Sequence, residues 1–149
     1  MTEVLFYQLD RRPLESVLVS LLEKSLERGW RAVVQISEGE RVDALDAHLW
    51  TYRDESFLAH GTAATGHSQH QPVYLTDASD NPNGAQIRFF VDGAEPQDVS
   101  GYERAVYLFD GRDDDQKQVA RGHWAALHDA GHEVTYWLQD DDGRWRKQA

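Results

Sequence analysis

The sequence predicts an α/β protein with a mostly parallel central sheet. Two observations support this class: the chain opens as strand, helix, strand and helix, and a later strand is again followed by a helix and another strand. Such alternation is typical of parallel sheets, because a crossover between parallel strands needs a long connection, usually a helix. With 149 residues, 40% of them hydrophobic, the chain is long enough for one ordinary core. We therefore expect a single domain over residues 1–149.

The first half of the chain supplies two strand–helix pairs. Val4–Leu9 is a short apolar run suited to a buried strand. In the next segment, leucine and valine recur at helical spacing between Pro13, which can open a helix, and Gly29, which can end one. Arg31–Ser37 is the second expected strand. The second expected helix carries its apolar residues on one face, namely Val42, Leu45 and Leu49.

The second half is richer in strands. We expect a loop over His60–Gln71, which is small and polar, and then two short strands in the segments PVYLTD and QIRFFVDG. Arg104–Gly111 is the clearest later strand, and it leads into a short helix that ends at Gly131. The chain returns as a strand in HEVTYWLQ, after which DDDG resembles a hairpin turn before RWRKQ.

The composition argues against several classes of function. A formal net charge of -11 argues against direct binding to DNA, which depends on many Lys and Arg side chains that neutralise phosphates. The absence of cysteine excludes disulfides, thiolate zinc sites and cysteine nucleophiles. The segment MTEVLFYQLDRR lacks the features of a signal peptide, and no stretch approaches the roughly 18 apolar residues of a membrane span. We therefore expect a soluble cytoplasmic protein that does not contact a membrane.

A Rossmann-like layout makes a small nucleotide-binding enzyme an alternative function. The dinucleotide motif GxGxxG is absent from the sequence. Gly61–Ser68 has the glycine spacing of a phosphate-binding loop, but His67 stands at the lysine position and Pro72 leads into a strand where a helix is needed. These departures make a phosphate-binding role for the loop a weak hypothesis.

Metal binding and catalysis also find little support in the sequence. His60, His67 and His70 lie close together, but no carboxylate or thiolate stands at a matching spacing, so we favour histidines in solvent. The acidic run before the last helix suits the positive end of the helix dipole. No GxSxG motif occurs. We therefore expect no metal, no cofactor and no catalytic residue.

One face of the helix expected after Asp115 carries two cations and a large aromatic. Lys117, Arg121 and Trp124 follow at i, i+4 and i+7, and His128 lies four positions further, so all four fall within about 60° of one another. Tryptophan among cations suits a ligand with acidic groups and an apolar or aromatic end. A solvated face, with the tryptophan packed by a neighbouring loop, explains the pattern equally well. The residues expected on the opposite, core-facing side are Val119, Ala126, Leu127 and Ala130.

Several longer segments allow a comparison with a known family. They are FYQLD, LDAHLWTYRDESFLAHG (Leu45–Gly61), QPVYLTD, QVARGHWAALHDAGHEV and YWLQDDDGRW, and the region Asp77–Ser100 matches only loosely. With these segments the chain resembles the chi subunit family of bacterial DNA polymerase III. The resemblance implies a Rossmann-like three-layer sandwich, with a mostly parallel central sheet flanked by helices, and no catalysis.

The resemblance also implies a function and partners. Chi proteins link the clamp-loader assembly of the polymerase to single-stranded DNA-binding protein, and they grip the acidic C-terminal tail of that protein, which ends in Pro-Phe. The resemblance thus implies a cytoplasmic adaptor, brought to the nucleoid through the replisome, that does not itself bind nucleic acid.

The family pattern assigns residues to these contacts. Lys117, Arg121 and Trp124 match the Lys, Arg and aromatic positions of the helix that binds the tail. His128 stands at a position that is basic in some relatives, and it is expected to add charge in mildly acidic solution. Two further matches are Trp50, for an aromatic beside the tail, and Phe57, for a residue that docks the psi subunit where psi exists.

Overall fold

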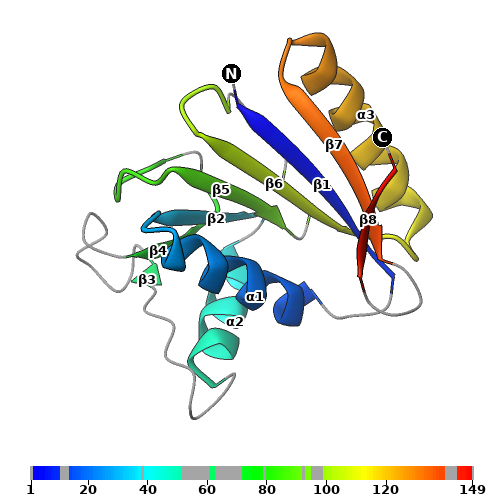
Figure 1. The fold of residues 1–149 in the computed structure, drawn as a ribbon. Helices are drawn as coiled ribbons and strands as arrows, with labels where there is room; N and C mark the ends of the chain where they lie inside the picture. Colours follow the sequence, from blue (N-terminus) through cyan, green and yellow to red (C-terminus); the bar gives the residue numbers. More distant parts are fainter. Residues whose placement is uncertain are drawn as a thin grey trace.

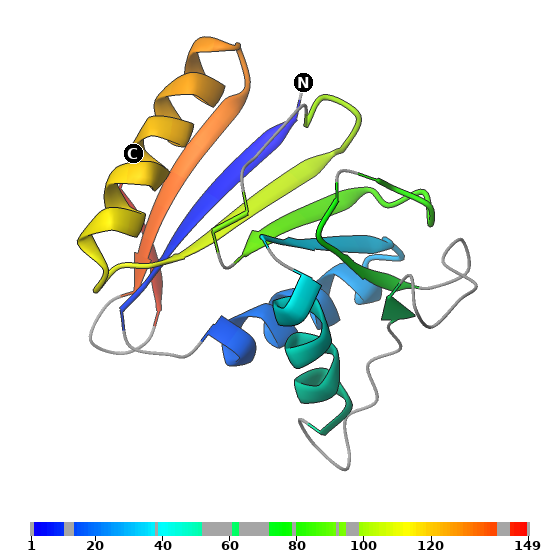
Figure 2. The same ribbon diagram turned by 180° about the vertical axis from the view of Figure 1, so that it is seen from behind.

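The molecule has three layers, with one central sheet between helices on both of its faces (Figure 1, Figure 2). The computed structural model describes residues 2–10, 14–37, 39–51, 61–62, 72–78, 80–91, 93–94, 99–139 and 144–148. Helices α1 (Leu14–Glu27) and α2 (Gly39–Thr51) cover one face, and α3 (Asp114–Asp129) covers the other. The predicted α/β sandwich is therefore confirmed.

The described part of the sheet has eight strands in the order β3-β4-β2-β5-β6-β1-β7-β8. Neighbouring strands run parallel, except for the antiparallel pair β7 and β8. The last pair confirms the expected hairpin, although the residues of its turn lie outside the described ones. The strands are β1 (Glu3–Leu9), β2 (Ala32–Ile36), β3 (Gly61–Thr62), β4 (Val73–Thr76), β5 (Ile87–Val91), β6 (Arg104–Asp110), β7 (Glu133–Gln139) and β8 (Trp145–Lys147).

The expectation of an unbroken loop over His60–Gln71 was wrong at its start. Gly61 and Thr62 form β3, which pairs in parallel with Tyr74 and Leu75 of β4. A two-residue edge strand is held by backbone hydrogen bonds to its neighbour, so it needs no apolar alternation that a sequence would reveal. The rest of that segment lies outside the described residues.

The sheet separates two hydrophobic cores. Strand β1 serves both, because successive side chains of a strand point to opposite faces. Val4 and Phe6 belong to the core beneath α3, whereas Leu9 belongs to the core beneath α1 and α2, and the half-buried Tyr7 packs against it. Burial of both faces explains why the central strands read as nearly continuous apolar runs.

The core-facing side of α3 differs from the expected one. Val119 is 50% exposed, and Ala126 and Ala130 are also exposed, whereas Ala120 is completely buried. Trp124 and Leu127 pack against the core beneath α3, so the apolar stripe follows positions 120, 124 and 127. The prediction was therefore right for Leu127 and wrong for Val119, Ala126 and Ala130, and it missed Ala120, which is the buried residue of α3. Trp124 therefore belongs to the core side as well as to the cationic side.

Candidate functional site

A pocket of about 460 Å³ lies between α3 and the β1–β7–β8 side of the sheet. Three of the residues singled out in the sequence, Lys117, Arg121 and Trp124, line it together. The other described lining residues come from β1, from β7 and from the segment after β8. They are Gln8, Tyr136, Leu138 and Gln148.

The start of α3 is fixed by its cap and by the turn before it. The Asp113 carboxylate accepts hydrogen bonds from the backbone N–H groups of Asp115 and Gln116, at 3.0 and 3.2 Å, and thus satisfies donors that a helix start leaves unpaired. The N–H of Gly111 donates to the carbonyl of Leu9 at 2.8 Å. The last of these hydrogen bonds joins the turn before α3 to the end of β1.

Gly111 is required here by lack of space. A Cβ atom at this position would overlap the side chains of Asp10 and Gln8. Gln8 lines the pocket, so the close approach of the β6–α3 turn helps to set the position of that side chain. At the other end of α3, Gly131 has a φ of 92°, a left-handed conformation that commonly ends a helix.

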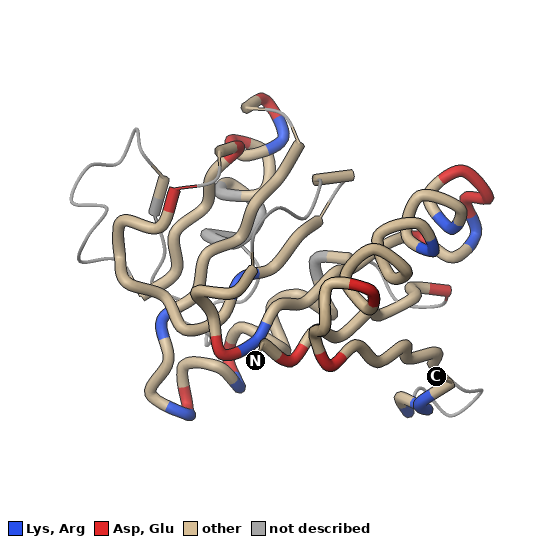
Figure 3. The backbone as a smooth tube through the Cα atoms, turned by 90° about the horizontal axis from the view of Figure 1, so that it is seen from above, with Lys and Arg blue, Asp and Glu red and all other residues tan. Residues whose placement is uncertain are grey.

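The two cations of the pocket are not neutralised locally. Lys117 is half-buried and Arg121 is exposed, and neither forms an ion pair with any described residue. Although the protein has a net charge of -11, the described lining of this pocket contains these two cations and no acidic residue. Figure 3 shows the cations of α3 and those of β8 at the same end of the molecule, where the acidic residues at the start of α3 also lie. An acidic ligand would find its attraction concentrated in the pocket.

Trp124, an aromatic residue of the lining, stacks on His128. Trp124 is half-buried, and its Nε1 atom is buried without a hydrogen-bond partner among the described residues. The ring of His128 lies 5.0 Å from the Trp124 ring, centroid to centroid, at an angle of 9°. The His128 side chain is 59% exposed and its Nδ1 lies 3.9 Å from Asp129 Oδ1. His128 thus flanks Trp124, although it is not among the described residues that line the pocket.

The pocket also contains a neutral polar pair. The Tyr136 hydroxyl donates a short hydrogen bond to Oε1 of Gln8. Burial raises the pKa of Tyr136, an effect that the Arg121 charge opposes and Asp10 reinforces. The phenol is therefore uncharged at neutral pH, and it leaves the positive charge of Arg121 available to a ligand.

The structure does not bring all predicted site residues into this pocket. Trp50 belongs to α2, on the opposite face of the sheet from α3, and its side chain lies outside the described part, as does the whole of Phe57. The described lining contains no residue of α2. Conversely, the sequence analysis missed four lining residues, Gln8, Tyr136, Leu138 and Gln148. Tyr136 stands two positions before Leu138 in an apolar strand, and this alternation was the available signal.

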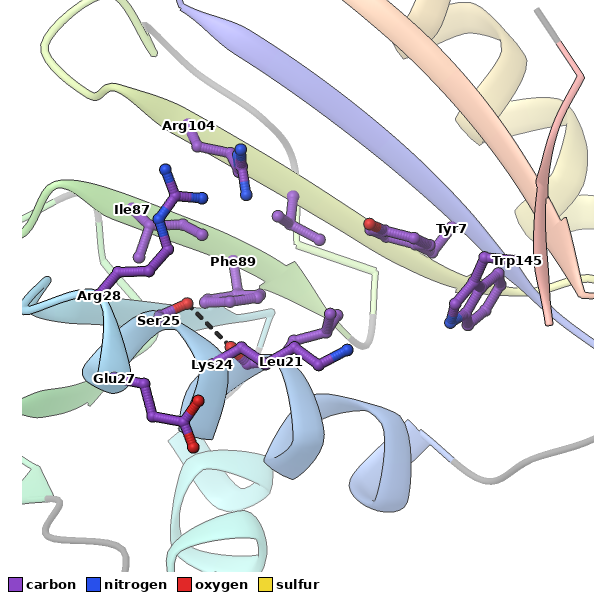
Figure 4. A pocket seen from close by; sticks show the side chains of 11 residues that line it. Tyr7, Leu21, Lys24, Ser25, Glu27, Arg28, Ile87, Phe89, Arg104 and Trp145 are labelled. Carbon is purple, nitrogen blue, oxygen red and sulfur yellow. Dashed lines mark hydrogen bonds between the residues drawn. The ribbon is translucent and has the colours of Figure 1, made fainter. Parts of the chain in front are cut away.

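A second pocket, of about 440 Å³, lies on the other face of the sheet, beside α1 (Figure 4). Its arginines are already engaged. The Arg28 guanidinium lies 4.0 Å from the centre of the Trp30 ring, and Arg104 lies 5.4 Å from it. Arg104 Nε is also 3.2 Å from a carboxylate oxygen of Glu3. Lys24 and Arg28 also line this pocket without an ion pair to a described residue, but the lining contains the acidic Glu27. The described lining of the pocket beneath α3 contains no acidic residue, and this difference distinguishes the two pockets.

A third pocket, near the carboxyl ends of β3 and β4, is acidic. This pocket, of about 270 Å³, lies between the start of α2 and the ends of β3 and β4, and the charged residues of its described lining are Asp43 and Asp77. Carboxylates repel phosphate groups, so this pocket disfavours a nucleotide. Within the described residues, no group of three or more His, Cys, Asp or Glu is placed to hold a metal ion. None of the described helices is long and apolar enough to cross a membrane.

Together, fold and pocket define a three-layer α/β protein with a cationic, aromatic-walled pocket near one edge of its sheet. The family model described as DNA polymerase III chi subunit, HolC, matches residues 1–135. The chain therefore belongs to the chi subunit family of DNA polymerase III, which confirms the resemblance seen in the sequence. A relative is the probable DNA polymerase III subunit chi of Rickettsia prowazekii (strain Madrid E), 28% identical over 83 residues. That alignment covers 56% of this chain and 48%, about half, of the relative.

Proposed function

We propose that this protein is a non-catalytic accessory subunit of the replicative DNA polymerase holoenzyme. In this role it links the clamp-loader assembly to single-stranded DNA-binding protein by gripping the acidic tail of that protein, which ends in Pro-Phe. Membership of the chi family supports the replication role. The observation that carries the tail assignment is the convergence of Lys117, Arg121 and Trp124 on one pocket.

The chemistry of the pocket suits such a tail. Arg121 can bind a carboxylate through two parallel hydrogen bonds, and Lys117 offers a second positive charge to the terminal carboxylate or to an aspartate. Trp124 and Leu138 supply the apolar surface that the phenyl ring of a terminal phenylalanine needs. The rest of this acidic protein repels an acidic peptide, so binding is restricted to the pocket.

His128 is proposed to act at the margin of the same site. Its ring stacks on Trp124 and remains largely exposed. Protonation in mildly acidic solution would place a third positive charge next to the tail.

Trp50 and Phe57 are proposed to make separate contacts. Trp50 would lie beside the tail, and Phe57 would dock psi or another clamp-loader subunit. Because α2 lies across the sheet from α3, each assignment needs its own test. If Trp50→Ala leaves tail affinity unchanged while Arg121→Ala weakens it, Trp50 does not belong to the tail site. For Phe57, retention of psi by Phe57→Ala in a co-purification would exclude the docking role.

Calorimetric titration with a synthetic acidic peptide ending in Pro-Phe tests the proposal. We expect binding that weakens at raised salt, and a loss on the order of 1.5–3 kcal/mol in Arg121→Ala, since a charge-assisted contact is removed. Arg41→Ala is the matched control, because Arg41 is exposed on α2, across the sheet. Absence of binding by the unmodified protein at low salt would contradict the tail assignment.

A further inference from the structure

The segment after residue 135, beyond the part that matches the family model, contributes to the pocket. Strand β8 pairs with β7 so that Leu138 lies opposite Arg146 and Trp137 lies opposite Lys147. Directly opposite residues of an antiparallel pair project to the same face of the sheet. Arg146 therefore shares the face of Leu138, which lines the pocket.

Lys147 lies on the other face of the same strand. Its partner Trp137 stacks on Tyr7 with ring centroids 6.3 Å apart, and Tyr7 packs against the core beneath α1. Arg146 and Lys147 are both exposed cations, adjacent in sequence but directed to opposite sides of the sheet. Of these two cations, only Arg146 lies on the face of the sheet that carries the pocket.

Gln148, the residue that follows β8, continues the pairing with β7 and also lines the pocket. The backbone N–H of Gln148 donates to the carbonyl of Tyr136 at 2.7 Å, and Gln148 itself lines the pocket. Since Gln148 is two positions after Arg146, both lie on the pocket face of the strand. The edge strand thus forms one wall of the pocket and places Arg146 at its margin.

We propose that Arg146 is a further specificity-determining residue that contacts the acidic residues preceding the Pro-Phe end of the tail. This inference rests on the proposed tail-binding function. Helix α3 presents two permanent cations inside the pocket, where the terminal residues would bind. Arg146 is outside the described lining but beside Leu138, so it meets a part of the peptide that extends beyond the pocket.

The test is calorimetric titration of the full protein with two peptides that share the Pro-Phe end. One keeps the acidic residues before that end, and the other carries their amides. We expect Arg146→Gln to weaken binding of the acidic peptide about two- to five-fold, the range for exposed ion pairs, and to reduce its salt dependence. The amide peptide should bind both proteins equally.

Lys147→Gln is the matched control, because it removes the same charge from the opposite face. It should leave both affinities unchanged. Arg146→Lys keeps the charge and should retain most of the salt dependence, and thermal unfolding of each variant verifies the fold. Equal weakening by Arg146→Gln and Lys147→Gln, or no weakening by either, would overturn the inference. If the unmodified protein binds neither peptide, the tail assignment itself fails, whereas loss with Arg121→Ala but not with Arg146→Gln rejects only the role of Arg146.

Discussion

The imidazole ring of His128 lies nearly parallel to the indole of Trp124, at an angle of 9° and a centroid distance of 5.0 Å. A protonated imidazole in this position would be attracted to the indole face and would also add positive charge beside the pocket. The Nδ1 atom of His128 lies 3.9 Å from a carboxylate oxygen of Asp129. The stack therefore connects the packing of Trp124 to the charge of the site.

The first prediction concerns the pH dependence that follows from this stack. We expect affinity for the acidic peptide to rise as pH falls from about 8 to about 6, where histidine gains its proton while the peptide carboxylates remain ionised. In His128→Gln the affinity should stay flat over that range. Titrations at several pH values measure this, and identical profiles for the two proteins would show that another group is responsible.

The second prediction separates the two roles of Trp124. Trp124→Ala should lose tail binding and also lower the free energy of unfolding by roughly 2–3 kcal/mol, because Trp124 packs against the core. Trp124→Phe should retain most of the tail binding and most of the stability, since Nε1 has no hydrogen bond to lose within the described structure. Chemical denaturation and peptide titration test the pair of variants. If Trp124→Phe loses as much tail binding and stability as Trp124→Ala, the indole itself is required.

The third prediction uses two glycines near the site. Gly111→Ala should destabilise the protein by about 1–3 kcal/mol and weaken tail binding, because a Cβ would overlap Gln8 and Asp10. Gly122→Ala is the control, since it lies within α3 with open space around its Cβ position. This variant should gain about 0.5–1 kcal/mol from helix propensity and bind normally. Thermal unfolding decides between these outcomes, and a neutral Gly111→Ala would contradict the close approach.

The fourth prediction concerns a buried arginine away from the site. Arg88 is 2% exposed, and its Nε and Nη2 donate to Oε1 of Gln35 at 3.0 and 2.6 Å. Its remaining donors bind the carbonyls of Asp80 and Ala78 and the hydroxyl of Tyr102. A lysine cannot reproduce this fork, so Arg88→Lys should lower the free energy of unfolding by on the order of 3 kcal/mol. Urea denaturation measures the loss, and Arg41→Lys should be neutral.

The fifth prediction concerns alkaline stability. Burial raises the pKa of Tyr136 and of Tyr7 above the usual value of about 10. A raised pKa in the folded state gives stability that is present below about 10 and is lost as pH rises through the folded-state pKa. Tyr136→Phe should lose about 1 kcal/mol at neutral pH with its hydrogen bond to Gln8, and should show a smaller alkaline loss. An unchanged alkaline profile would show that Tyr136 does not contribute to the alkaline loss of stability.

The elements were predictable because their signals are local. The apolar run before Leu9 and the glycines at positions 29 and 131 define strand and helix limits by short-range physics. The rotation of α3 about its axis was not predictable in the same way, because the burial of Ala120 and the exposure of Val119 result from packing against the sheet. The cationic stripe was found by helical spacing. Gln8 and Gln148 were missed, because they reach the pocket only through strand pairing across most of the chain.

This pairing has a consequence for how the protein is made. Strand β1 precedes the other described strands in the sequence, yet it pairs with β6 and β7. Glu3 can therefore reach its partners only after Arg104 and Glu133 have been synthesised. Closing such long loops is entropically unfavourable and slow. The half of the sheet around β2, β4 and β5 can assemble earlier with α1 and α2. A pocket lined by both Gln8 and Gln148 can form only after β8 has been synthesised and has paired with β7.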